Sequence, residues 1–308
     1  MTAEAVTASP PKKAKRPKSG DMQTRRDRWL SINLAVPTIL LLGFAQVYPL
    51  IQGILYSFQK GKTTKPSQGW VGLQNYSRVL HDAEFWEAVK FTAIFSVGGV
   101  ALSYLIGLGL ALLLSRDIPM RGLLRVGFII PWVLPSIVAM TAWRWMLQDE
   151  RGAVNLVLGW FNIDPIGFFN NGKWAAVAAI MVKAWRSFPF MLVSLMATLQ
   201  SLDDVLDEAA VIDGANKWQR FWHVTFPQIL PMSAILWVLM MIWCVNDYET
   251  PFLLTLGSKY TRNLMIYTFN ESIYHNLGTG SASAVLTLIV LGVLAYFMLK
   301  LQKKASDQ

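Results

Sequence analysis

The chain has 308 residues, of which 54% are hydrophobic and 15% are charged. Soluble domains usually carry about 25% charged residues, so this composition excludes an ordinary soluble protein and indicates a chain whose solvent is largely lipid. The sequence contains a single cysteine, Cys244, which excludes an internal disulfide. The formal net charge is +9, and the distribution of this charge along the chain bears on its topology.

Six apolar stretches are long enough to cross a bilayer as helices, because a hydrocarbon core of about 30 Å needs about 20 helical residues. They cover residues 29–58, 89–114, 123–147, 174–199, 229–256 and 282–301. Strands of a membrane barrel would be about ten residues long with alternating polarity, which these stretches are not. The sequence therefore predicts an all-α integral membrane protein with six transmembrane helices in residues 29–302.

Lysine and arginine are distributed unequally between the two ends of the predicted helices. Sixteen lie on one side, in a leader over residues 1–28, in the 2–3 and 4–5 connections and in the C-terminal segment from Lys300 onward, and nine lie on the other side. Basic residues mark the cytoplasmic side, so both termini are expected there. The Pro- and Lys-rich leader is expected to be disordered. Its position beside a spanning helix favours contact with anionic membrane lipid over nucleic-acid binding.

Two patterns within the stretches concern helix packing. In the second stretch, small residues recur every four positions: Gly99, Ser103, Gly107 and Ala111. This pattern predicts a face where another helix can approach closely. Pro131, Pro135 and Pro189 are expected to interrupt the third and fourth helices. Such breaks often line a cavity in membrane proteins, although simple packing of the bundle explains them equally well.

The connection over residues 200–231 differs from the others. Ser201 and Asp204 have the spacing of a capping box and predict the start of a short helix. Gly214 is expected to end it, because glycine takes the left-handed cap conformation without strain. A second short helix with one aromatic face follows, and Pro227 is expected to end that helix. The sequence thus predicts a helix–turn–helix at the cytoplasmic surface.

This connection resembles the EAA signature of permease subunits in binding-protein-dependent ABC importers. The matching residues are Glu208, Ala209, Ala210, Gly214, Val224, Phe226 and Pro227. The phrase EAAVIDGANKWQRF is similar to the sugar-permease branch typified by the maltose importer. Further matches bring the resemblance to residues 30–302; they include WVGLQNY at residues 70–76, and Pro131, Trp132, Pro135 and Trp143 in the third stretch.

The resemblance implies a type I ABC permease bundle in the bacterial cytoplasmic (inner) membrane. Its expected partners are a second homologous permease, two cytoplasmic ATPase subunits and an external solute-binding protein. The chain's only Gly-Lys-Thr run, residues 61–63, has Tyr56 where a phosphate-binding loop needs glycine. The chain is therefore expected to be a non-catalytic subunit without a cofactor, with ATP and Mg held by the ATPase subunits. The residues implied to contact the ATPase are Glu208, Ala209, Ala210 and Gly214.

The resemblance also implies a sugar site built from the third, fourth and fifth helices. Its residues, carried over by motif, are Trp132, Ser136, Lys183, Arg186, Ser187, Phe190, Met240, Trp243, Cys244 and Asp247. Sugar recognition needs flat aromatic faces and a few directed polar groups. Trp132, Phe190 and Trp243 are the stacking candidates. For any one of these aromatics, packing in the core or at the membrane interface is the competing interpretation.

Three of these positions, Lys183, Arg186 and Asp247, are charged where the maltose-type site is neutral or apolar. Asp247 could neutralise one cation and leave the other unpaired, which is unfavourable in a buried site unless an anionic sugar pairs with it. The favoured interpretation is a neutral disaccharide or oligosaccharide, with Arg186 directed along the helix to a carbonyl or to the interface. Arg144 and Glu249 are expected near the outer interface.

The function predicted from the sequence is inward movement of a sugar by alternating access. The three histidines are scattered along the chain, which argues against a metal site, and no paired carboxylates or nucleophile–histidine arrangement suggests catalysis. A proton-coupled secondary carrier would need inverted repeats or a buried relay of acids. A channel would leave the EAA connection unexplained.

The predicted topology can be tested by cysteine labelling in a Cys244→Ala background. Cysteine placed at Asn216 should react only with a reagent that reaches the cytoplasm, whereas cysteine at Gln68 or Asn171 should react with an impermeant maleimide outside intact cells. Labelling of position 216 from outside would overturn the topology.

Overall fold

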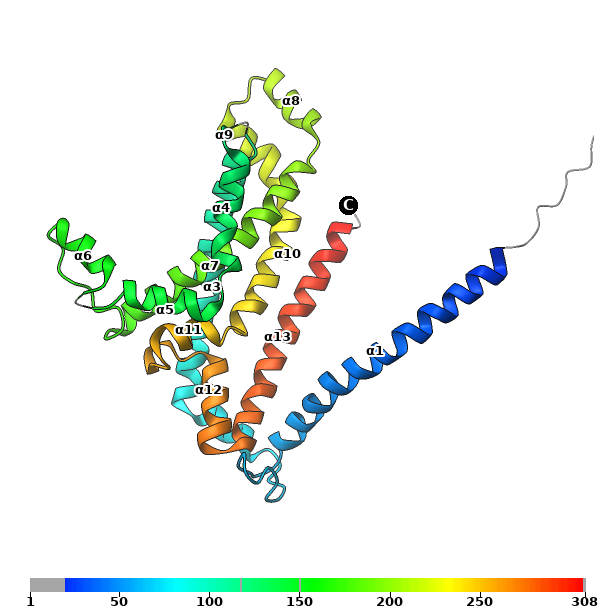
Figure 1. Ribbon diagram of the computed structural model, residues 1–308, viewed down its shortest axis with the longest axis vertical. Helices are drawn as coiled ribbons and strands as arrows, with labels where there is room; N and C mark the ends of the chain where they lie inside the picture. The colour runs from blue at the N-terminus through cyan, green and yellow to red at the C-terminus, as the bar shows by residue number, and fades with distance from the viewer. Residues whose placement is uncertain (1–19, 117, 150, 307–308) are drawn as a thin grey trace, which may run out of the picture. The chain divides into compact units, whose positions relative to one another are not determined.

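The computed structural model describes residues 20–116, 118–149 and 151–306 (Figure 1). Their regular elements are helices, apart from two isolated β-bridges in residues 59–70. The chain divides into two compact units, residues 1–52 and 53–308. Residues 1–19 of the predicted leader lie outside the described residues. Helix α1 (Gly20–Ser57) begins nine residues before the predicted start at Trp29, because the prolines of the leader all precede Gly20.

The structure confirms an all-helical membrane protein with five to six candidate spans. Five helical segments in the described residues are long and apolar enough to cross a membrane: Ile32–Ser57 in α1, α3 (Ala83–Leu114), α7 (Gly172–Gln200), Lys217–Val245, which ends with α10 (Phe226–Val245), and Leu277–Lys303 in α13 (Leu277–Ser306). The third predicted span, residues 123–147, is instead a pair of helices, α4 (Arg121–Val133) and α5 (Ser136–Met146), bent by 93°.

The bend between α4 and α5 has its cause at Pro135. Proline disfavours the helical conformation of the preceding residue, and Leu134 accordingly has extended backbone angles, with φ −61° and ψ 134°. The predicted interruption at Pro135 is therefore confirmed. Pro131 and Pro189 lie inside α4 and α7, which continue through them, so the predicted interruptions there are wrong.

The fifth predicted helix is also broken. Residues 229–256 were expected to form one helix, but α10 ends at Val245 and α11 (Glu249–Thr255) follows after a three-residue break. Polar side chains in the break compete for backbone groups. The Asn246 amide donates to the carbonyl of Ile242 at 3.0 Å, and the Asp247 carboxylate accepts from the backbone N–H of Thr250 at 2.9 Å. The continuous helix predicted there is therefore wrong.

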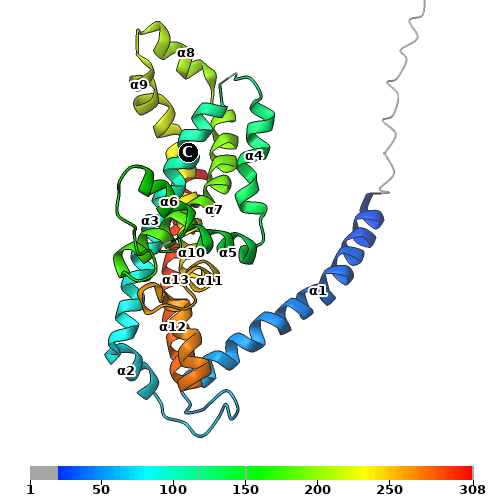
Figure 2. The ribbon, with the colours of Figure 1, turned by 60° about the vertical axis from the view of Figure 1, so that its left-hand side comes forward.

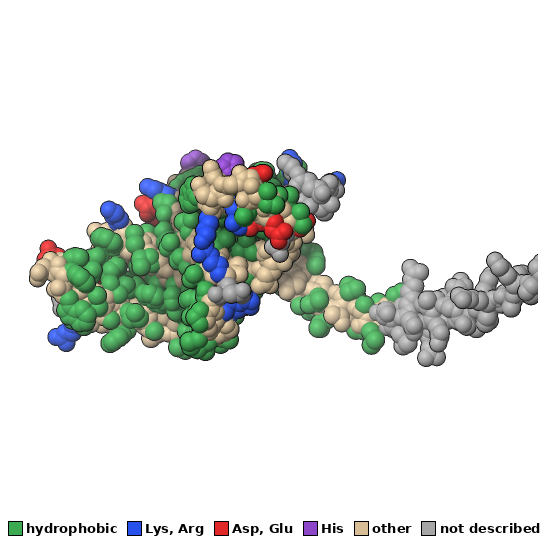
Figure 3. Space-filling view, turned by 90° about the horizontal axis from the view of Figure 1, so that it is seen from above, with side chains coloured by type: hydrophobic (Ala, Val, Ile, Leu, Met, Phe, Trp, Pro, Cys, Tyr) green, Lys and Arg blue, Asp and Glu red, His purple; other side chains and the backbone are tan. Residues whose placement is uncertain are grey.

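The remaining elements are short. They are α2 (Gln74–His81), α6 (Ala153–Trp160), α8 (Asp204–Ile212), α9 (Lys217–Arg220), a π-helical turn at Phe221–Thr225, a 3₁₀ turn at Lys259–Thr261, α12 (Leu264–Asn270) and a second π-helical turn at Glu271–His275. Helices α8 and α9 project at one end of the helices of the 53–308 unit, opposite α12 (Figures 1 and 2). Seen from the α8–α9 end, much of the surface is hydrophobic (Figure 3), as lipid-facing helices require.

Helices α3 and α7 pack against each other along the small-residue face of α3. The four small residues predicted to form that face are all buried. A Cβ atom added to Gly107 would lie 2.6 Å from Cβ of Met191 and 3.0 Å from the backbone nitrogen of Leu192, and one added to Gly99 would lie 3.1 Å from Cγ of Lys183. The predicted close helix approach is therefore confirmed.

This packing predicts that Gly107→Ala destabilises the protein. The added methyl group would meet atoms close to the α7 backbone, and such overpacking costs about 1–3 kcal/mol, more than the roughly 1 kcal/mol that alanine gains in helix propensity. Thermal unfolding of the detergent-solubilised protein measures the effect. Gly109→Ala is the matched control, because it lies on the same helix with open space around it. Equal unfolding midpoints for the two variants would contradict the packing argument.

Candidate functional site

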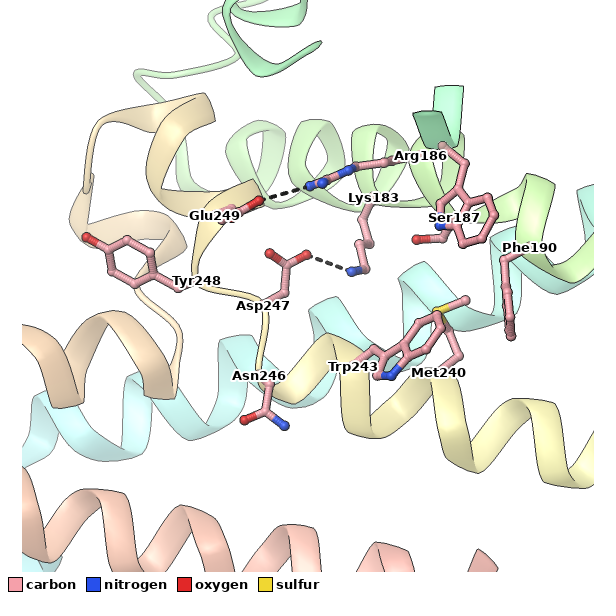
Figure 4. Close-up of a pocket in the computed structure, with 11 residues that line it drawn as sticks. Lys183, Arg186, Ser187, Phe190, Met240, Trp243, Asn246, Asp247, Tyr248 and Glu249 are labelled. Atoms are coloured by element: carbon pink, nitrogen blue, oxygen red, sulfur yellow. Dashed lines mark hydrogen bonds and ion pairs between the residues drawn. The ribbon is translucent and has the colours of Figure 1, made fainter. Parts of the chain in front are cut away.

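A cavity of about 490 Å³ lies between α4, α7, α10 and the break after α10 (Figure 4). Its lining residues are Trp132, Lys183, Arg186, Ser187, Phe190, Met240, Trp243, Asn246, Asp247, Tyr248 and Glu249. Eight of the ten residues predicted to form the sugar site are among them. The other two, Ser136 and Cys244, do not line the cavity. The Ser136 hydroxyl accepts a hydrogen bond from Arg186, and Cys244 is fully buried.

One wall of the cavity is aromatic. The rings of Trp132 and Phe190 have centroids 6.2 Å apart, and those of Phe190 and Trp243 have centroids 4.9 Å apart. The three rings come from α4, α7 and α10, and both tryptophans remain about half exposed, at 52% and 42%. The wall therefore offers flat apolar faces to a ligand while the rings support one another.

The opposite wall contains a buried ion pair between α7 and the break after α10. Nζ of Lys183 lies 2.7 Å from Oδ2 of Asp247, and the two side chains are only 10% and 7% exposed. The Asp247 carboxylate also accepts from the hydroxyl and the backbone N–H of Thr250, at 2.7 and 2.9 Å. Its backbone carbonyl accepts from the Asn263 amide at 2.6 Å. A buried ion pair is tolerated when its remaining polar atoms are satisfied in this way.

A second, more open ion pair lies beside the first. Nη1 of Arg186 lies 3.5 Å from Oε2 of Glu249, and the side chains are 23% and 58% exposed. The other terminal nitrogen of Arg186 donates to the Ser136 hydroxyl. The expectation of one uncompensated positive charge is therefore wrong, because Glu249 supplies a second carboxylate. Arg186 also lines the cavity instead of pointing to the interface.

Three lining residues were not predicted from the sequence: Asn246, Tyr248 and Glu249. They share one cause, the break after α10. On the continuous helix predicted over residues 229–256, positions two apart such as 247 and 249 would not face the same direction. The break lets both carboxylates reach the cavity, as Figure 4 shows. The sequence feature that could have indicated the break is the run of polar residues from Asn246 to Glu249 inside an apolar stretch.

A second candidate site is the α8–α9 connection. Helix α8 is capped by Asp203, whose carboxylate accepts from the backbone N–H of Val205 at 3.0 Å. The predicted capping box is wrong, since the Ser201 hydroxyl donates instead to the carbonyl of Thr198 at the end of α7. Gly214 ends the helix as predicted, with φ +81°. The backbone N–H groups of Gly214 and Ala215 donate to the carbonyls of Val211 and Ala210, which satisfies the helix end.

The start of α9 and its pairing with α8 make the connection rigid. Asn216 and Gln219 form a capping box, a pattern that is visible in the sequence but was missed. The guanidinium of Arg220 binds the carboxylate of Asp207 through two nitrogens and so joins α9 to α8. The predicted helix end at Pro227 is wrong, because the helical path continues from Lys217 to Val245. Proline is tolerated in the first turn of α10, where its missing N–H needs no partner.

The surface of this connection combines apolar and acidic groups. Its exposed large apolar residues are Val205, Leu206, Val211, Ile212, Trp218 and Trp222. Glu208 is exposed and pairs with no side chain among the described residues. An exposed apolar cluster with polar neighbours is typical of a surface that binds another protein.

The described residues contain no group of three or more His, Cys, Asp or Glu side chains placed to hold a metal ion. The chemistry available in the cavity is therefore that of aromatic faces, amide and hydroxyl groups and two ion pairs. Such a cavity can bind and orient a polyhydroxylated solute.

Comparison with known proteins identifies the family to which the chain belongs. Residues 99–307 match the family described as binding-protein-dependent transport system inner membrane component. The chain is 31% identical to the trehalose/maltose transport system permease protein MalF of Thermococcus litoralis, over 86% of this chain and 91% of the relative. It is 32% identical to the sulfoquinovosyl glycerol transport system permease protein SmoG of Agrobacterium fabrum, over 84% of this chain and 85% of the relative.

A solved structure supports the fold. The crystal structure of a bacterial ABC transporter for import of the acidic polysaccharide alginate superposes with a TM-score of 0.79 and 21% identity, over 92% of this chain and 98% of that chain. The chain therefore belongs to the family of inner-membrane permease subunits of binding-protein-dependent ABC importers, in the carbohydrate-uptake branch.

Proposed function

We propose that this permease moves a disaccharide, an oligosaccharide or a related sugar derivative inward by alternating access through the cavity between α4, α7 and α10. The observation that carries the proposal is the pairing of an aromatic wall with a polar wall in one cavity of about 490 Å³. Pyranose rings present flat C–H faces and a rim of hydroxyls, which match these two walls. Relatives named for trehalose/maltose and for sulfoquinovosyl glycerol support a sugar as the solute.

In the proposal, Trp132, Phe190 and Trp243 stack on the sugar, while Arg186 and Ser187 bond its hydroxyls. Lys183 and Asp247 shape the polar wall. Ser136 acts through Arg186, and Cys244 supports the wall from behind. The half-exposed tryptophans favour completion of the site by a second, homologous permease, since a sugar held by one wall alone would remain largely hydrated.

The α8–α9 connection is proposed to dock on a cytoplasmic ATPase subunit, with Glu208, Ala209, Ala210 and Gly214 at the contact. Two such ATPase subunits would hold ATP and Mg, and this chain would hold neither. The rigidity of the connection supports this role. A displacement of α8 would be transmitted to α9 through the Asp207–Arg220 ion pair. From α9 the helical path continues to Val245, next to the polar wall of the cavity. Stiff elements transmit such movements well.

The proposed orientation places the α8–α9 end and both termini in the cytoplasm, because basic residues are more numerous on that side. The external solute-binding protein would then meet the opposite end, where α12 lies. Family membership leaves no room for the rival interpretations of a secondary carrier or a channel. An anionic sugar remains the second candidate solute, supported by the relative named for a sulfonated one.

Docking on the ATPase predicts the effects of two substitutions. Glu208→Lys should abolish co-purification with the ATP-binding subunit and lower transport at least about tenfold, since reversing a buried interfacial charge costs several kcal/mol. Gly214→Pro should act similarly, because proline cannot take the φ of +81° found there. Membrane levels of both variants are checked by immunoblot.

Glu87→Lys is the matched control, because it reverses an exposed glutamate on α3, far along the chain from the connection. It should keep the ATPase subunit bound. Normal co-purification and normal transport by Glu208→Lys would show that the connection does not dock on the ATPase.

A further inference from the structure

The two ion pairs in the cavity differ in how firmly they are held. The Lys183–Asp247 pair has a 2.7 Å contact between two nearly buried side chains, and three further hydrogen bonds hold Asp247 in place. Only a small part of either side chain is exposed to the cavity, so a solute has little access to the two charges. This pair therefore belongs mainly to the framework of the cavity.

The Arg186–Glu249 pair is available to a ligand. Its contact between Nη1 of Arg186 and Oε2 of Glu249 is 3.5 Å long, and the Glu249 side chain is 58% exposed. Arg186 has five N–H donors in a planar fork that matches a carboxylate or a sulfonate. Its contacts to Glu249 and Ser136 use only part of that capacity. A ligand group can therefore approach Arg186 without dismantling the wall.

The charges lining the cavity cancel. Two cations, Lys183 and Arg186, face two carboxylates, Asp247 and Glu249. A neutral sugar can donate hydroxyls to Glu249 and accept from Arg186 without disturbing this balance. An acidic sugar would bring its negative charge close to Glu249, and like charges in a partly desolvated site repel strongly. Of the two carboxylates, only Glu249 is exposed enough to act on the ligand directly.

We propose that Glu249 determines the charge selectivity of this sugar site, reserving Arg186 for neutral, polyhydroxylated solutes. Removing its negative charge frees Arg186 to bind a carboxylate or sulfonate and shifts the site toward acidic sugars. The inference rests on the proposed function, because it assigns the solute of that same cavity.

The test measures direct binding to the complete importer in lipid nanodiscs without the solute-binding protein, whose own selectivity would otherwise mask that of the cavity. The probes are maltose and its 6′-uronic acid, which keeps both pyranose rings and replaces one hydroxymethyl group by a carboxylate. The second pair, glucosyl glycerol and sulfoquinovosyl glycerol, replaces one hydroxyl group by a sulfonate. Glu249→Gln should raise the ratio of acidic to neutral affinity at least about tenfold.

The double variant Arg186→Gln/Glu249→Gln is the matched control, because it makes the same change at position 249 in a cavity that is again balanced. It should show no gain for the acidic sugars. An equal gain in the double variant, or equal affinities of the parent for acidic and neutral probes, would overturn the assignment to Glu249.

A second measurement is independent of the choice of sugar. Iodide and acrylamide quenching of Trp243 fluorescence, taken as the difference between each protein and its Trp243→Phe counterpart, reports the charge of the cavity. Glu249→Gln should increase quenching by iodide and leave quenching by acrylamide unchanged. Unchanged iodide quenching would overturn the selectivity proposal. Absence of binding by every sugar, with the iodide effect present, would instead contradict the proposed function.

Discussion

The buried ion pair between Lys183 and Asp247 is the interaction on which the site depends. It joins the middle of α7 to the break after α10, and Asp247 extends the connection to α11 through Thr250 and toward α12 through Asn263. Helix α3 lies close to Lys183, and the glycine at position 99 leaves room for the lysine side chain. Because isolated buried charges are unfavourable by several kcal/mol, the helices that carry the two partners cannot separate without loss of stability.

This arrangement connects the two candidate sites through one continuous helical path. The Asp207–Arg220 pair joins α8 to the start of that path, and Val245, at its other end, directly precedes the break that holds Asp247. In the proposed importer, movement of the α8–α9 connection would thus change the polar wall and the position of Trp243 on α10. The rest of the aromatic wall, on α4 and α7, would respond through the close packing of α3 against α7. In the proposed site, the Lys183–Asp247 pair would hold the wall of the cavity, and the more open Arg186–Glu249 pair would contact the solute.

Features that depend on local chemistry were predictable from the sequence. The apolar stretches predicted the spans, including the third, which breaks at Pro135. The spacing of small residues predicted the packing face of α3, and Gly214 predicted the end of α8. The breaks were harder, because a polar residue in an apolar stretch can either interrupt the helix or face a partner. Glu249 reaches the cavity only because the chain breaks at residues 246–248, and its partner Arg186 lies 63 residues away in sequence. The continuation of the helix through Pro227 likewise depends on position within the first turn of α10, which periodicity alone does not reveal.

A double-mutant cycle on Lys183 and Asp247 tests the central claim most directly. Lys183→Met and Asp247→Asn would each be compared with the double variant by thermal unfolding of the purified importer and by Trp243 fluorescence. Each single variant leaves one buried charge unpaired, at a cost of about 3–5 kcal/mol. The account therefore predicts a large fall in the unfolding midpoint for both singles and substantial recovery in the double variant. Strictly additive losses, with the double variant the least stable, would show that the two charges do not hold the cavity wall together.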